Sequence, residues 1–204
     1  TCSGYTGSST LADFPVAVRL SAGSPDCFAY SDMYDSTKGN EIRFADDEGN
    51  SLSYEIENWD PNGTSLIWVK IPSLSKGTTF TMYYGGDPTD VVASDWTWRA
   101  SDYVGVWHMT EDGGTAFDSA NGLDAEPIGA YAKSMQKSTT GVFGKGRVNS
   151  TDTRGYQGQS MLQVSDSTLL DCGNTFTFSG WVRMTDISAN DLNRIVSRNR
   201  GGSY

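Results

Sequence analysis

The feature that most constrains this chain is the recurrence of short strand-like segments separated by polar, glycine-bearing turns. Val16, Val18 and Leu20 alternate with Ala17 and Arg19, which predicts a strand with one buried and one solvated face. Segments of this kind recur along the 204 residues, and few windows have helical spacing. The 23 glycines, set among many Ser, Thr, Asn and Asp residues, fit a chain with frequent turns. The pattern predicts an all-β fold of antiparallel sheets.

The strand candidates divide the chain into two β modules. In chain order they occupy residues 15–20, 41–44, 53–59, 65–71, 78–84, 103–109, 160–164, 174–184 and 194–197. Residues 46–50 are expected to form the turn of a hairpin between the second and third candidates. Pro72 is expected to end the fourth, because proline cannot donate to a ladder. We therefore predict a β-sandwich at residues 1–88, a connector at 89–102 and a second β-sandwich module at 103–204.

The charge of the chain excludes some partners. Its formal net charge of −10 argues against nucleic acid, whose phosphates require a basic surface, and disfavours anionic lipid. No apolar run approaches the roughly 18 residues of a membrane span. The first residues are polar and uncharged, so no signal peptide is expected and Thr1 is interpreted as a mature start. Neutral glycans, cations and basic proteins remain possible partners.

Three cysteines cannot all pair within one chain. Cys2 and Cys27 flank the first strand candidate, so we expect a disulfide between them. The bridge would close a loop of about 25 residues and stabilise the fold by roughly 3 kcal/mol. Cys172 lies outside that pair. A cysteine metal site is not expected, because no C-x-x-C spacing occurs.

Two sets of segments carry a resemblance to known families. In the first module they are LADFPVAVRL (11–20), IRFAD (42–46), YEIENWD (54–60), IWVKIP (67–72) and MYYG (82–85). In the second module they are VWHM (106–109), DS (118–119), FGKG (143–146) and FTFSGWV (176–182). The first module resembles a domain of unknown function from secreted bacterial proteins. The second is similar to the laminin-G-like superfamily.

The resemblance implies that residues 103–204 form a concanavalin-like jelly roll. Such jelly rolls have several further strands, so this one is expected to be truncated and completed by further polypeptide. The resemblance also implies a bacterial extracellular, cell-surface or periplasmic location. As a first functional hypothesis, it favours recognition of a glycan or a surface protein over catalysis.

Two acids on one strand are the candidate catalytic pair. Glu55 and Glu57 project from the same face because strand side chains alternate. Their carboxyls could approach the roughly 5–5.5 Å separation of a retaining glycosidase. The alternative, which we prefer, is the solvated outer face of a hairpin. His108, the single histidine, is expected to be a satisfied, partly buried side chain, because no Ser-His-Asp or Cys-His relay can be placed around it.

A loop in the second module is the candidate metal site. Asp118, Asn121 and Asp124 supply hard oxygen ligands suited to Ca²⁺, and a cluster of Asx turns is the alternative. Residues 46–50 also have many oxygen ligands but lack the EF-hand order, so a plain turn is expected there.

Loop aromatics are the candidate ligand-binding residues. Trp98, Tyr131 and Tyr156 lie outside the alternating strands, where aromatic rings can stack on sugars. Packing between the modules is the preferred interpretation of the connector tryptophans. We therefore predict a non-catalytic module that binds a glycan or a surface protein. The alternatives are a structural or assembly domain of a bacterial envelope complex and, less favoured, a glycosidase.

Overall fold

The computed structural model describes residues 2, 4–86, 97–99, 102–128, 136–149, 161–183 and 195–197. Its strands are β1 (Leu11–Leu20), β2 (Arg43–Ala45), β3 (Tyr54–Asn58), β4 (Ser65–Leu74), β5 (Thr81–Tyr83), β6 (Ala125–Ile128), β7 (Gln136–Thr140), β8 (Lys145–Asn149) and β9 (Met161–Val164). Two short 3-10 turns, η1 (Tyr30–Asp32) and η3 (Thr168–Leu170), are the helical elements of the described residues. All strand pairs are antiparallel, which confirms the predicted all-β class. In the part of the chain that the structure describes, no helix has the length and apolarity to cross a membrane.

The internal contacts divide the chain into two compact units, Thr1–Leu170 and Asp171–Tyr204. The predicted boundary near residue 88 and most of the predicted connector lie outside the described residues, so the division into modules stays a prediction.

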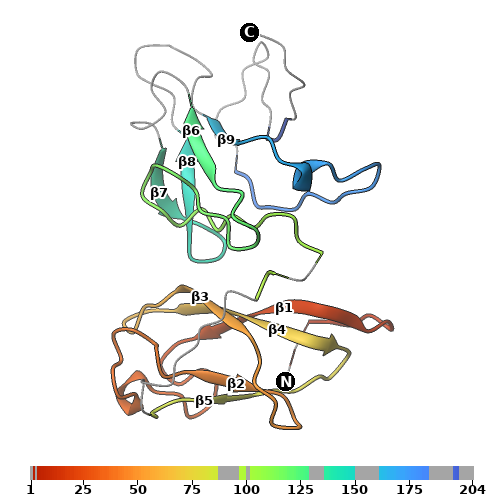
Figure 1. Cartoon of the computed structure of the whole chain (residues 1–204). Coiled ribbons are helices and arrows are strands. Elements are labelled where there is room, and N and C mark those ends of the chain that lie inside the picture. The colour runs from red at the N-terminus through yellow and green to blue at the C-terminus, as the bar shows by residue number, and fades with distance from the viewer. Residues whose placement is uncertain are drawn as a thin grey trace, which may run out of the picture. The chain divides into compact units, whose positions relative to one another are not determined.

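The first unit begins with a β-sandwich made of two sheets. One sheet has the order β1-β4-β3 and the other pairs β2 with β5 (Figure 1). The predicted turn at residues 46–50 is formed, with the Asp46 amide donating to the Asn50 carbonyl at 3.0 Å, but the predicted pairing of the second strand candidate with the third is wrong. Only an isolated bridge joins Ala45 to Ser51, after which the chain enters the other sheet and pairs β3 with β4. In a sandwich each sheet buries one face against the other sheet. Consecutive strands that enter opposite sheets therefore contribute side chains to both sides of the core.

Pro72 does not end β4, as the sequence predicted, but lies within it. The pairing of β1 with β4 runs from Leu20–Ser65 to Leu11–Leu74. The ladder has no Cα pair at Asp13 and Pro72, and Asp13 there takes a φ of 48°. The irregularity accommodates the missing amide, because proline is tolerated in a strand where pairing is interrupted.

The core of this sandwich is aromatic and its buried hydroxyls are satisfied. Tyr30, Phe28 and Trp59 meet edge to face, with ring centroids 4.9 and 5.4 Å from that of Tyr30. The Tyr30 hydroxyl donates to the carbonyl of Leu20 at 2.9 Å and lies 2.8 Å from Ser65 Oγ. Buried tyrosines normally require such partners, because an unpaired hydroxyl loses its hydration without compensation. The buried cluster comprises Leu20, Phe28, Tyr30, Met33, Ile42, Phe44, Leu52, Tyr54, Ile67, Val69, Ile71 and Leu74.

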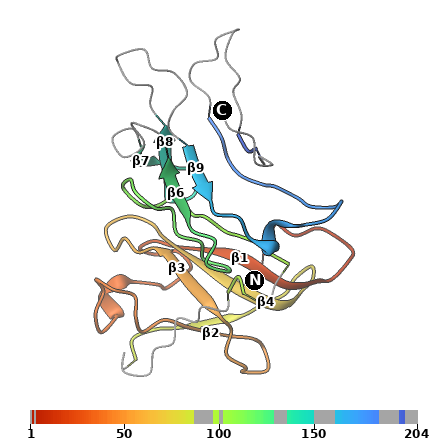
Figure 2. The ribbon, with the colours of Figure 1, turned by 45° about the horizontal axis from the view of Figure 1, so that its top comes forward.

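Two further strand pairs belong to the first unit. β6 pairs with β9 and β7 with β8, and Figure 2 shows the partners of each pair side by side. The expected strand at residues 160–164 is confirmed as β9, whereas the strand predicted at residues 103–109 is not formed. In that segment only Trp107 makes a bridge, to Asp118, and Met109 takes a φ of 59°. The aromatic side chains of this segment instead contact other parts of the first unit.

The second unit is described at residues 171–183 and 195–197. The strand predicted at residues 174–184 forms no ladder within this described part. Phe176, Phe178 and Val182, which were expected to face a core together with Met184, are 72, 56 and 55 % exposed. Met184 lies outside the described residues.

Candidate functional site

The main cluster of ionisable side chains joins β3 to the segment that carries His108. Glu55 and Glu57 lie two residues apart on β3 and therefore point to the same face, as predicted. His108 Nε2 is 3.4 Å from Glu55 Oε2, and Nδ1 is 3.1 Å from Glu57 Oε2. Each imidazole nitrogen therefore has its own carboxylate. The cluster connects residues more than fifty positions apart in the sequence.

Two tryptophans complete the polar contacts of these acids. Trp68 Nε1 donates to Glu57 Oε2 at 2.6 Å, and Trp98 Nε1 donates to Glu55 Oε2. The Trp68 ring also stacks on the imidazole, with centroids 6.2 Å apart and planes inclined by 20°. An aromatic face beside a cationic ring adds to the electrostatic stabilisation of the cation.

This environment favours a charged histidine. Burial alone would lower the pKa of His108, but hydrogen bonds to Glu55 and Glu57 and the charge of both carboxylates raise it to about 9. Burial would likewise raise the pKa of Glu55, but hydrogen bonds from His108 and Ser119 hold it below its usual value. At neutral pH the cluster is therefore an imidazolium held by carboxylates.

The expected solvated outer face is wrong for Glu57, whose side chain is 3 % exposed, while that of Glu55 is 29 % exposed. The expectation of a partly buried, satisfied His108 is confirmed, since its side chain is 13 % exposed and bonded on both nitrogens. Sequence patterning found the acids and the histidine separately. It missed their association, because the contacts join distant segments and leave no local signal.

The hydrogen bonds of the cluster determine which chemistry it can support. Ser119 Oγ donates to Glu55 Oε1 at 2.6 Å and so contacts the acid rather than the imidazole. A serine nucleophile needs a neighbouring base to take its proton, and here both ring nitrogens of His108 face carboxylates. A cavity of about 260 Å³ borders the cluster, and its lining includes Glu55, Glu57, His108, Ser119 and Phe117. The arrangement of His108 between Glu55 and Glu57 suits an ion-paired contact that holds β3 and the His108 segment together.

The candidate calcium loop is organised around one carboxylate. Asp118 Oδ1 accepts hydrogen bonds from the amides of Val106 and Ala120, and Oδ2 from those of Asn121 and Leu123, at 2.7–2.9 Å. Burial would raise the pKa of Asp118, but these backbone donors hold it below its usual value. The geometry is that of the Asx-turn alternative, in which the carboxylate takes the place of a backbone acceptor.

The other two predicted ligands have structural partners as well. Asp124 Oδ1 accepts from the Asp118 amide at 2.9 Å, and Asn121 Nδ2 donates to the carbonyls of Tyr103 and Val104. Among the described residues, no group of three or more His, Cys, Asp or Glu side chains could hold a metal ion. Calcium binding by this loop stays a prediction.

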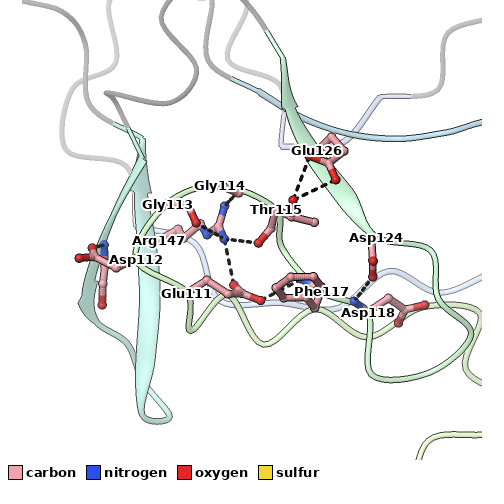
Figure 3. A network of polar contacts seen from close by, with 11 residues as sticks. Glu111, Asp112, Gly113, Gly114, Thr115, Phe117, Asp118, Asp124, Glu126 and Arg147 are labelled. Carbon is pink, nitrogen blue, oxygen red and sulfur yellow. Dashed lines mark hydrogen bonds and ion pairs between the residues drawn. The ribbon is translucent and has the colours of Figure 1, made fainter.

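An arginine fixes the neighbouring loop at residues 111–115. Figure 3 shows Arg147 reaching from β8 to Glu111, and the Nη2–Oε2 distance is 3.0 Å. The same guanidinium donates to the carbonyls of Gly113, Gly114 and Thr115. Glu111 Oε1 in turn accepts from the Phe117 amide at 2.8 Å. Five directed donors make arginine suited to tying several backbone carbonyls together.

The predicted ligand-binding aromatics have different outcomes. Trp98 is 5 % exposed and packs edge to face against Trp68 and Tyr103, so its ring is enclosed by protein. For Trp98 this agrees with the preferred packing interpretation, whereas the other connector tryptophan, Trp96, lies outside the described residues. Tyr131 and Tyr156 lie outside the described residues, and their role in ligand binding stays a prediction.

The predicted disulfide is not formed. Cys2 and Cys27 are both free thiols in the structure. The Cys2 amide donates to the carbonyl of Thr78, while the Cys27 carbonyl accepts from the Tyr84 hydroxyl. The positions of Cys2 and Cys27 on either side of the first strand candidate therefore did not predict a disulfide correctly.

Comparison with known proteins agrees with part of the predicted resemblance. No curated protein and no solved structure matches the chain. One family model, described as a domain of unknown function (DUF2341), matches residues 38–98. This range contains β2 to β5, both acids of the cluster and Trp98. The resemblance of the second module to laminin-G-like domains stays a prediction. Residues 38–98 are thus similar to a domain family of unknown function, as the resemblance predicted for the first module.

Proposed function

We propose that this chain is a non-catalytic module of an extracellular or cell-surface protein and that it recognises a glycan or a surface protein. The observation that carries the proposal is the internal use of the two candidate catalytic acids. Glu57 is enclosed by Trp68 and His108, and Glu55 accepts from Trp98 and Ser119. A β-sandwich rich in loops then offers surfaces for recognition without a reactive side chain.

A glycan array followed by isothermal titration, with calcium and with a chelator, tests this proposal. We expect at least one glycan class to bind and to raise the melting temperature at millimolar concentration, since a ligand that binds only the folded state stabilises it. A calcium-dependent affinity would support the predicted metal loop. If no glycan on the array binds or shifts the melting temperature, glycan recognition is excluded and a surface protein remains as the partner.

A structural role is the second candidate, and the second unit favours it. Phe176, Phe178 and Val182 are all more than half exposed, and Trp181 is 74 % exposed. Apolar side chains gathered in one short segment are typical of a surface that another polypeptide covers. We propose that further polypeptide completes a jelly roll here. The coding sequence beyond Tyr204 tests this, because strand-forming sequence should follow, and a stop codon at that point would contradict it.

The glycosidase alternative requires Glu55 and Glu57 to act as acid and nucleophile on a bound sugar. The variants Glu55→Gln and Glu57→Gln test it directly. Hydrolysis of any glycan that either substitution abolishes, in a protein that remains folded, would establish the enzyme. Unchanged hydrolysis in both variants would remove it.

A further inference from the structure

A second cavity lies where one end of the first sheet meets the turn between β7 and β8. Its volume is about 420 Å³, within the range of roughly 300–1,000 Å³ of small-molecule sites. Arg19 of β1 and Asn58 of β3 contribute to the lining from the sheet, followed by Asp60 and Thr64 of the β3–β4 loop. Lys145 contributes from the start of β8.

A glycine with a positive φ shapes the β7–β8 turn beside β3. Gly144 takes a φ of 58°, which strains any residue with a β carbon. A β carbon placed there would lie 3.4 Å from Glu57 Oε1 and 3.8 Å from the β carbon of Asn58. These are ordinary van der Waals distances, so the turn lies beside the side chains of β3, and the positive φ rather than the available space favours glycine here.

The two cations in this cavity are available to a ligand. The Arg19 guanidinium lies 5.0 Å from the centroid of the Phe143 ring, a cation–π contact that orients it. Among the residues that the structure describes, neither Arg19 nor Lys145 forms an ion pair. This is unusual in a chain of formal net charge −10, where carboxylates outnumber cations. An arginine fork and an ammonium that line the same cavity are a combination that binds carboxylates well.

The remaining polar groups suit hydroxyls. The Asn58 amide donates to the Thr64 carbonyl at 3.1 Å and retains its side-chain oxygen as an acceptor. Asp60 Oδ1 accepts from the Asn62 amide at 3.0 Å, and the carboxylate can accept further hydrogen bonds from hydroxyls. A carboxylate in the lining also repels a ligand with several negative charges. The cavity thus favours a ligand with one carboxylate and several hydroxyls.

We propose that this cavity binds one hexuronic acid unit of an acidic glycan, with Arg19 and Lys145 holding its carboxylate and Asn58, Asp60 and Thr64 its hydroxyls. The inference rests on the proposed recognition of glycans and specifies both the place and the chemical class. It distinguishes units with a single anionic group from units with several, which place more negative charge near Asp60.

Isothermal titration with a trisaccharide of one galacturonic acid and two galactose units, and with the matched neutral galactose trisaccharide, tests the proposal. We expect the acidic ligand to bind at least tenfold more tightly, because a charge-assisted hydrogen bond is stronger than the neutral one that replaces it. Arg19→Gln and Lys145→Gln should each reduce that affinity about tenfold and leave the melting temperature unchanged. Arg19→Lys should give an intermediate loss, because it keeps the charge but not the planar fork.

The matched control is Lys76→Gln, which removes one exposed positive charge from a turn that does not line the cavity. It should leave the affinity for the acidic trisaccharide unchanged. An equal loss in Lys76→Gln and Lys145→Gln would show general charge attraction and overturn the cavity assignment. Equal binding of both trisaccharides, or an acidic-ligand affinity that Arg19→Gln leaves unchanged, would overturn it while glycan recognition stands. If no glycan of either charge binds, the proposed function fails first.

Discussion

At the scale of single residues, His108 is the side chain that pairs with both acids of β3. It separates Glu55 from Glu57, and its removal would leave neighbouring carboxylates without their shared cation. Breaking a buried ion pair by deleting one partner is costly, because the remaining charge is neither hydrated nor compensated.

His108→Ala is therefore expected to lower the free energy of unfolding by about 3 kcal/mol, measured by urea denaturation. The control is Lys38→Ala, which removes a cation paired with Asp35 at 3.2 Å on the surface. Its side chain is 64 % exposed, so the loss should stay below about 1 kcal/mol. Equal losses in the two variants would show that the buried cluster contributes no more than an exposed pair.

The pH dependence of stability should report the same imidazolium. The pKa of His108 is raised to about 9 in the folded protein from 6.5. A raised pKa means that the stabilisation is complete below the unfolded value and is lost as the pH rises through the folded one. Stability should fall between about pH 6.5 and 9.5, by an amount on the order of 3 kcal/mol. Melting curves of the wild type and His108→Asn test this, and a variant that retains the same slope would contradict the assignment.

At the scale of elements, the loop at residues 118–124 depends on one carboxylate for its shape. Asp118→Ala would leave four backbone amides without their acceptor, and we expect a loss of about 2–3 kcal/mol. Asp118→Asn keeps one acceptor oxygen and should lose less. Melting temperatures measured with calcium and with EDTA provide the control. If calcium stabilises the wild type but not Asp118→Ala, the loop binds metal and the carboxylate is a ligand.

The elements also show what the sequence could and could not predict. Alternation identified β1 correctly, because Leu20 is buried while Ala17 and Arg19 are exposed. The partner of β2 could not be predicted from the polar turn that follows it, because the turn does not determine which sheet the next strand joins. Residues 103–109 alternate like a strand, yet Trp107 donates its indole N–H to the Leu123 carbonyl and forms only one bridge.

The candidate site shows the same division between local and long-range information. The shared face of Glu55 and Glu57 follows from the period of a strand and was predicted. The burial of Glu57 beneath Trp68 and His108 depends on packing between distant segments. No local pattern encodes such packing, because a charged side chain in a strand is exposed far more often than it is buried.

At the scale of the whole molecule, the exposed phenylalanines of the second unit should govern self-association. Replacing Phe176 and Phe178 together with serine should reduce dye binding to apolar surface and aggregation, and should leave the melting temperature unchanged. Phe44→Ser is the matched control, since Phe44 is 2 % exposed and its loss should unfold the sandwich. A large drop in melting temperature in the double variant would mean that these rings are packed, contrary to their observed exposure.

The proline within β4 has a consequence for how molecules of this protein meet. The register of β3 with β4 ends at Val69, so residues 71–74 extend past their neighbour on that side. A strand arriving from a second molecule would find no amide at Pro72, and across the ladder Asp13 turns the backbone out of line. One of the two ten-residue strands of the sandwich thus resists edge-to-edge pairing with a second molecule. Crowding should therefore favour contacts through side chains over growth of a continuous sheet.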